Sequence, residues 1–163
     1  MGNKVLNENI TSKFLPKGKV KTVKGSILNP EYAGLRLILN FVNQSGKPES
    51  SLYSLFDKKW KKVKEETKGW YASRINFKLG EINTIAVQSD TWVINCLCQN
   101  EGNSVQETAL NDCIKKIASI AKNEKASVHV SVELFKDFPN LMQNLNTHLV
   151  DNGINVSVYE EQP

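Results

Sequence analysis

From residue 78 to the carboxyl terminus, strand-like and helix-like segments alternate, and this order restricts the possible fold more than any other feature of the sequence. Runs rich in β-branched residues occupy 77–87, 92–99, 128–132 and 154–159. Helical spacing of apolar residues fills the longer gaps after 99 and after 132. Strands that alternate with helices predict an α/β domain, and such domains usually bind ligands beyond the carboxyl ends of their strands. We therefore look for function in the loops at those ends.

Two amphipathic helices are predicted in this half of the chain. Ser104 and Glu107 have the spacing of a capping box, which predicts that Ser104 caps the first helix. Asp137 or Pro139 is expected to open the second helix, and Gly153 to stop it. The apolar faces comprise Leu110, Cys113, Ile114, Ile117 and Ala121 in the first helix, and Leu141, Met142, Leu145 and Leu149 in the second.

The first half of the chain contains two further predicted strands. Residues 20–23 form a short one, whereas 35–42 is almost entirely apolar and is typical of a central strand covered on both faces. A helix is expected next, and residues 68–76 are interpreted as a polar connection whose Trp70 and Tyr71 fold back onto the core. The apolar stripe of that helix comprises Leu52, Leu55, Phe56, Trp60 and Val63.

The length of 163 residues predicts one domain that needs neither disulfides nor a structural metal. Residues 1–19 are polar and are interpreted as an arm or an irregular edge, with the domain spanning 20–163. No segment has the length of a membrane helix, and the amino terminus lacks the apolar run of a secretory signal. We expect a cytoplasmic protein.

The three cysteines, Cys96, Cys98 and Cys113, lie within apolar segments, which favours buried thiols over disulfides. Cys96 and Cys98 point to the same side of a strand, as a pair of metal ligands would. No second Cys or His pair stands at ligand spacing, so we expect no metal site.

The net charge of +4 would help to attract an anionic ligand. The densest basic run, 58–64, includes Trp60 and is compatible with a nucleic-acid contact. Its apolar residues continue the helical stripe, however, which favours lysines on a solvated helix face. A nucleic-acid partner is not expected.

The sequence lacks the phosphate-binding, dinucleotide-binding, hydrolase-elbow and zinc-protease motifs. Only two histidines are present. His129 falls in the middle of a predicted strand, which favours a satisfied core side chain over a general base. His148 is expected on a solvated helix face.

Two loops are candidate ligand sites. Residues 43–51 join a buried strand to a helix amino terminus, which suits an anion or phosphate but is also an ordinary connection. Glu133 and Asp137 follow the strand 128–132, where an α/β domain places ligand-handling groups. Asp137 as a helix cap beside an exposed Glu133 is the alternative.

The order of elements, together with several short motifs, resembles the macro domain family of ADP-ribose-binding proteins, in particular its small single-domain ADP-ribosyl-glutamate hydrolase-like branch with phage and bacterial members. The matching segments are 23–27 (Val-Lys-Gly-Ser-Ile), 40–46 (Asn-Phe-Val-Asn-Gln-Ser-Gly), 79–82 with 92–99, 128–130 and 153–159. The resemblance implies a single three-layer α/β domain with a mixed central sheet flanked by helices. It also implies a cleft for ADP-ribose or a related nucleotide at the strand ends, with no cofactor.

Site residues follow from the same resemblance. Ligand contacts are implied for Ser26, Ile27, Asn40, Asn43, Gln44, Ser45, Gly46, Ser50, Ser51, Glu133, Leu134 and Phe135. The hydrolase branch uses an acidic residue and a lysine, for which Asp137 and one of Lys47, Lys58 or Lys59 are the candidates.

The sequence departs from the family pattern in three places. Ser26 replaces the usual adenine-binding Asp, and 47–51 replaces a glycine-rich stretch. The glycine-rich second phosphate loop is replaced by 131–138, whose side chains would obstruct close approach of backbone amides to a pyrophosphate. A non-catalytic binder, either a reader of ADP-ribosylated protein or a sequestering protein, is therefore the first hypothesis.

Two alternatives remain open. One is an ADP-ribosyl hydrolase or ADP-ribose phosphoesterase with relocated catalytic groups. The other is a protein-interaction module with a closed pocket, which exposed Phe135 and Phe138 side chains would favour.

Overall fold

A six-stranded sheet in the order β1-β6-β5-β2-β4-β3 forms the centre of the molecule. The computed structural model describes residues 16–47 and 50–162. The strands are β1 (Val20–Lys24), β2 (Arg36–Asn43), β3 (Ile82–Gln88), β4 (Thr91–Gln99), β5 (Ser127–Ser131) and β6 (Val156–Glu160). All neighbouring pairs are parallel except β3 with β4, which form an antiparallel hairpin. The sheet is therefore mixed, as predicted.

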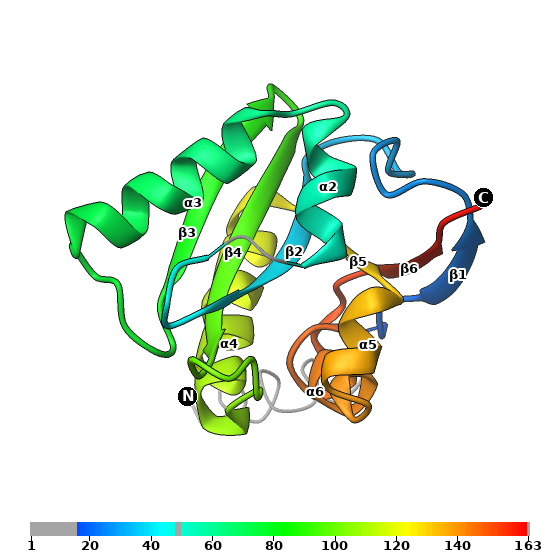
Figure 1. The fold of residues 1–163 in the computed structure, drawn as a ribbon. Coiled ribbons are helices and arrows are strands. Elements are labelled where there is room, and N and C mark those ends of the chain that lie inside the picture. The colour runs from blue at the N-terminus through cyan, green and yellow to red at the C-terminus, as the bar shows by residue number, and fades with distance from the viewer. Residues whose placement is uncertain (1–15, 48–49, 163) are drawn as a thin grey trace.

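Helices cover both faces of this sheet, as Figure 1 shows. They are α2 (Ser51–Asp57), α3 (Lys62–Ser73), α4 (Glu107–Glu124), α5 (Glu133–Asp137) and α6 (Leu141–His148), followed by a 3-10 turn at Val150–Asn152. In the view of Figure 1, α2 and α3 lie in front of the sheet and α4 lies behind it, where α6 contacts α4. The predicted three-layer α/β domain is confirmed.

The core is built around β2 and β4. Every residue of β2 after Arg36 is buried, and β2 lies between β4 and β5, which confirms that this strand is central. Cys96, Cys98 and Cys113 are buried free thiols, as expected. In the part of the chain that the structure describes, no group of three or more His, Cys, Asp and Glu side chains is placed to hold a metal ion.

The expected helix from 52 to 63 is in fact two helices, and the prediction of a polar connection at 68–76 is wrong. The chain turns between Asp57 and Lys62, which buries Trp60 with its ring centroid 6.4 Å from that of Phe56. Residues 68–73 continue α3, because Val63, Thr67 and Trp70 form a buried face at helical spacing. Thr67, a polar residue in the middle of this face, interrupts the apolar helical pattern in the sequence. Trp70 is buried and Tyr71 half-buried, as predicted.

Three predicted boundaries are also wrong. β3 begins at Ile82, not at 77, after a turn in which Gly80 has a φ of 93°. Ser104 does not cap α4, because Val105 pairs with Gln99 in a β-bridge and the helix begins two residues later. The last helix, α6, begins at Leu141 after Asn140, and the preceding segment forms the separate helix α5.

The predicted amino-terminal arm, 1–19, lies mostly outside the described residues. At its end Gly18 donates a backbone hydrogen bond to Val150. At the opposite margin of the sheet, the Lys62 ammonium donates to the carbonyl of Ala86 on β3, at 2.7 Å. None of the helices in the described segments is long and apolar enough to cross a membrane.

Candidate functional site

The carboxyl ends of five parallel strands lie at one edge of the sheet. The loops after β1, β2, β4, β5 and β6 therefore converge there, and this edge is where α/β domains bind ligands. The loop after β2 and the helix α5 after β5 are the two segments that the sequence singled out, and both border this edge.

Two adjoining hollows of about 160 and 190 Å³ form a cleft at this edge. They share Phe41, Ser50, Gln99 and Asp137; the smaller is completed by Asn43, Lys47, Tyr53 and Asn103, and the larger by Asn40, Ser51, Leu52, Glu133, Leu134 and Lys136. Of the predicted ligand contacts, the structure thus brings together Asn40, Asn43, Ser50, Ser51, Glu133 and Leu134. These contacts stay predictions, but the residues lie around one cavity.

Hydrogen bonds fix the loop after β2 against the end of β4. The Asn43 side chain accepts a hydrogen bond from Ser45 Oγ and donates one to Asn103 Oδ1, both at 2.6 Å. The Gln44 amide donates to the carbonyl of Gln99. Gly46 has a φ of 69° and lies against the Tyr71 side chain. The amides of Asn43, Gln99 and Asn103 therefore present a pre-positioned polar wall to the cleft.

The floor of the cleft is buried and polar. Asn40 donates to Asn95, which donates to the Thr67 hydroxyl, which donates to the carbonyl of Val63. The Asn40 Oδ1 and Tyr53 hydroxyl oxygens are buried and accept or donate no hydrogen bond within the described chain. Burial raises the pKa of Tyr53 to about 12, despite the neighbouring Asn40 and Thr67 side chains, so its hydroxyl stays protonated.

The opposite wall carries the carboxylates of Glu133 and Asp137 and the ammonium group of Lys136. The Glu133 carboxylate forms an ion pair with Lys136 at 3.1 Å, and its backbone amide donates to Ser131 Oγ. Partial burial, and then the neighbouring Glu133, raise the pKa of the Asp137 carboxyl. Each carboxylate can accept hydrogen bonds from hydroxyl groups of a ligand.

Of the four candidate catalytic groups, Lys47 and Asp137 line the same hollow. They form no ion pair with each other in the described structure. Lys58 is exposed outside the cleft, and the Lys59 ammonium binds the carbonyl of Leu28 and the Asn29 side chain.

Ser26 and Ile27 do not line either hollow. The Ser26 hydroxyl and the Ile27 amide both donate to one oxygen of the Glu161 carboxylate, at 2.9 and 3.0 Å. The segment after β6 therefore occupies the donors that were expected to bind ligand. Nothing in the local sequence at 23–27 indicated this partner, which lies more than 130 residues away.

The remaining predicted contacts also lie outside the hollows. Gln44 is exposed. Ser45 and Gly46 fix the conformation of the loop through their contacts with Asn43 and Tyr71 respectively. Phe135 and Phe138 are half-buried and pack against the core, so they form no exposed aromatic surface. The predicted contacts did not include six residues that line the hollows: Phe41, Leu52, Tyr53, Gln99, Asn103 and Lys136. The one signal available in the sequence was that Gln99 ends the predicted strand 92–99, at the edge where ligand contacts were expected.

The histidines are not part of the cleft. Both ring nitrogens of His129 have partners, Ser127 Oγ at 2.7 Å and the Tyr159 hydroxyl at 2.8 Å, which confirms a satisfied core histidine. His148 is half-buried and lies 3.3 Å from Asn111 Oδ1, so the prediction of a solvated side chain is wrong in part.

A larger groove of about 610 Å³ lies elsewhere, between α3 and β3. Glu65, Glu66 and Glu81 line it, and only Glu81 has an ion-pair partner within the described ranges. This negative lining opposes an anionic ligand, although the groove lies toward the same edge of the sheet, where Ile82 pairs with Cys96 and the Leu97 amide donates to the carbonyl of Glu81 near the carboxyl end of β4. The smaller cleft is therefore the better candidate.

No family model matches the sequence, and no curated protein is similar to it. Solved structures are similar. A Bacteroides thetaiotaomicron protein is 24% identical with a TM-score of 0.80, over 88% of this chain and 99% of its own. A macrodomain protein from Streptomyces coelicolor is 22% identical with a TM-score of 0.81, over 87% and 99%. Thermosipho africanus DarTG in complex with ADP-ribose is 14% identical with a TM-score of 0.61, over 77% and 38%. These likenesses establish the fold.

Proposed function

We propose that this chain, which has the macrodomain fold, binds ADP-ribose or a related nucleotide in the cleft between the loop after β2 and helix α5. The observation that carries the proposal is the open cavity at the convergent strand ends, walled by the amides of Asn43, Gln99 and Asn103 and bordered by Lys47. The ADP-ribose complex of a protein with the same fold supports the choice of ligand.

The cleft is polarised, and this favours one orientation of the ligand. Phosphate oxygens suit the side with Lys47 and the amide groups. Ribose hydroxyls suit the larger hollow, where the Glu133 carboxylate accepts hydrogen bonds, and the Asp137 carboxylate, which lines both hollows, repels phosphate. The hollows, of about 160 and 190 Å³, are small for a whole ADP-ribose molecule, so we place the terminal ribose and its phosphate inside and the rest of the ligand along the rim.

A non-catalytic role, as reader or sequestering protein, is the form of this proposal that we favour. Acid–base catalysis needs groups within hydrogen-bond reach of the reacting atoms. Lys47 and Asp137 share a hollow without touching, and the glycine-rich phosphate loop of related folds is replaced here by helix α5.

The test is calorimetric titration of the protein with ADP-ribose, with mass spectrometry of any small molecule that copurifies. Binding with one-to-one stoichiometry, or a nucleotide carried through purification, is expected. Absence of both results would contradict the proposal and direct attention to a protein partner.

Hydrolysis is the second candidate, because Lys47 and Asp137 line one cavity. Incubation with ADP-ribosylated protein separates the two functions. Bound but uncleaved substrate is expected for the reader, whereas release of ADP-ribose that is abolished in Asp137→Asn would establish the hydrolase. The interaction module lacks its expected support, since Phe135 and Phe138 pack against the core.

A further inference from the structure

A second polar hollow, of about 310 Å³, lies at the opposite edge of the sheet, where β5 and β6 begin. It is bordered by Tyr32, by Lys122 and Lys125 at the end of α4, and by Asn152 and Asn155 before β6. Its size is at the lower limit for sites that bind metabolites. Nothing in the proposed function uses it.

The charge of this hollow differs from that of the cleft at the other edge. Lys122 and Lys125 are exposed and form no ion pair within the described residues, and no carboxylate is among the lining side chains. The nearby carboxylates of Glu31 and Asp151 form ion pairs with Lys21 and Lys17 respectively, whereas the exposed Glu124 of α4 has no ion-pair partner within the described residues. The alternative role for Lys122 is structural, because a lysine in the last turn of α4 offsets the partial negative charge at the carboxyl end of the helix. That role does not require a hollow beside the lysine.

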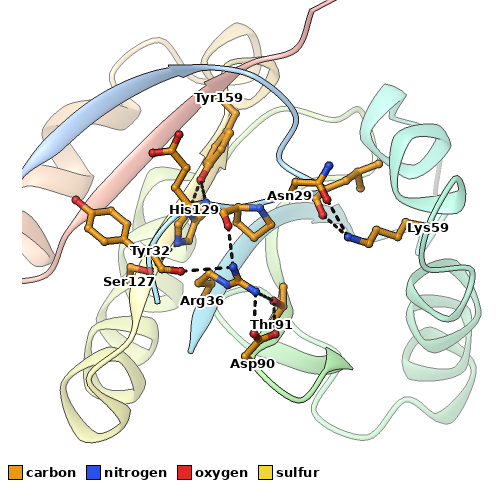
Figure 2. Close-up of polar contacts among 12 residues, drawn as sticks. Asn29, Tyr32, Arg36, Lys59, Asp90, Thr91, Ser127, His129 and Tyr159 are labelled. Atoms are coloured by element: carbon orange, nitrogen blue, oxygen red, sulfur yellow. Dashed lines mark hydrogen bonds and ion pairs between the residues drawn. The ribbon is translucent and has the colours of Figure 1, made fainter. Parts of the chain in front are cut away.

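Tyr32 borders the hollow in a backbone conformation that bulky residues rarely adopt, with a φ of 73°. Figure 2 shows the contacts that hold its loop in place. Arg36 donates to the carbonyls of Pro30 and Tyr32, at 2.8 and 3.4 Å, and the Glu31 amide donates to the Tyr159 hydroxyl at 2.8 Å. Such conformations persist where surrounding contacts enforce them, and they cluster at functional sites.

The Arg36 side chain is also held by two residues at the turn between β3 and β4. Its guanidinium binds Thr91 Oγ1 at 2.9 Å and forms an ion pair with Asp90 at 3.0 Å (Figure 2). The loop therefore holds Tyr32 at the border of the hollow that Lys122 and Lys125 also line; the Lys21 ammonium covers one face of the ring, 4.4 Å from its centroid, so a ligand ring would stack on the other face. Lysine ammonium groups bind phosphate as point charges, and an aromatic side chain offers a surface on which a planar ring stacks.

We infer that this hollow is a second binding site for a small phosphorylated metabolite of mononucleotide size, with its phosphate on Lys122 and Lys125 and its planar ring against Tyr32. The amides of Asn152 and Asn155 supply further polar contacts. The site is independent of the cleft at the carboxyl ends of the strands.

The test is a titration of the ¹⁵N-labelled protein with AMP and, separately, with inorganic phosphate. AMP should shift the amide signals of Tyr32, Gly153 and Asn155 saturably. Lys122→Gln with Lys125→Gln should weaken this binding about tenfold or more, because charge-assisted contacts are lost. Lys115→Gln, an exposed lysine elsewhere on α4, is the matched control and should leave it unchanged.

Two further variants separate the parts of the proposal. Tyr32→Gly suits the positive φ and removes the ring, so AMP should then bind no more tightly than phosphate. Asn43→Ala alters the other cleft and should leave the Tyr32 and Asn155 shifts unchanged. AMP shifts confined to Asn43 and Gln99, or insensitivity to loss of both lysines, would overturn the site. Equal affinity of the unmodified protein for phosphate and AMP would overturn the ring contact.

Discussion

Asn40 and Asn95 lie opposite each other on β2 and β4, fully buried, with the Asn40 Nδ2 donating to the Asn95 Oδ1 at 2.9 Å. Asn95 in turn donates to Thr67 on α3. This short chain of amides ties the central strands to the helix layer directly under the cleft. Buried polar groups are costly to leave unpaired, so the chain also specifies the register of β2 on β4.

Asn95→Ala is expected to lower the free energy of unfolding by about 1–3 kcal/mol, because it strips Asn40 and Thr67 of partners in the core. Urea unfolding measures this change. Asn123→Ala, at an exposed position of α4, is the control and should leave the free energy unchanged or slightly higher. Equal effects of the two substitutions would mean that the buried network contributes nothing specific.

The stability of the protein should fall as the pH falls below 6.5. Burial, and then the charges of Arg36 and Lys21, lower the pKa of His129 to about 3. Between about pH 3 and pH 6.5, His129 therefore binds a proton in the unfolded chain but not in the folded chain. The stabilisation is complete above 6.5 and is lost as the pH falls, by at most about 1.4 kcal/mol per pH unit for one histidine.

Urea midpoints between pH 7 and 5 measure this slope, in a range above the ordinary pKa values of the carboxylates. His129→Gln should flatten it. The pKa of half-buried His148 is also lowered, so His148→Gln should flatten it to a smaller extent. An imidazole signal of His129 that titrated near 6.5 in the folded protein would contradict the prediction.

Two glycines should respond in opposite ways to alanine. Gly46 has a positive φ, and a Cβ there would collide with the Tyr71 side chain, so Gly46→Ala should lower the free energy of unfolding by about 1–3 kcal/mol and weaken ADP-ribose binding. A Cβ at Gly69 within α3 would meet nothing within 4 Å, so Gly69→Ala should raise the free energy of unfolding by about 0.5–1 kcal/mol. Thermal unfolding and calorimetry of both variants provide the comparison.

Asp137→Asn should leave the affinity for ADP-ribose unchanged or higher, because the substitution removes negative charge from the cleft. For the same reason, the affinity of the unmodified protein should rise as the pH falls through the raised pKa of Asp137. Calorimetry at pH 7 and pH 5 tests both statements, with Asp57→Asn, which is paired with Lys64 outside the cleft, as control. A tenfold loss of affinity in Asp137→Asn would show that this carboxylate binds the ligand directly.

The inner strands β2, β4, β5 and β6 were largely predictable from the sequence because burial dominates them. The continuous apolar run of β2 marks a central strand without reference to any other segment. The helix ends were not predictable in the same way. Ser104 has an ideal capping pattern, but pairing of Val105 with Gln99 displaces the helix start, and that contact depends on the tertiary structure.

The candidate cleft was predictable only in part. Asn43, Ser50 and Glu133 follow strand ends, and the topology brings such residues together. Ser26 was assigned from its place in a short motif, but its donor is taken by Glu161, a contact between chain segments that no local pattern reports. Asn103 and Tyr53 enter the cleft because their elements fold back over it.

The ammonium of Lys62 over the carbonyl of Ala86 has a consequence for the behaviour of the protein in a crowded solution. An outermost strand offers its backbone to any extended chain that approaches, and this is how sheets of different molecules fuse into aggregates. A molecule that approached β3 along this margin would have to displace a charged side chain from its acceptor first. Lys62 thus disfavours self-association of the protein through the β3 edge of the sheet.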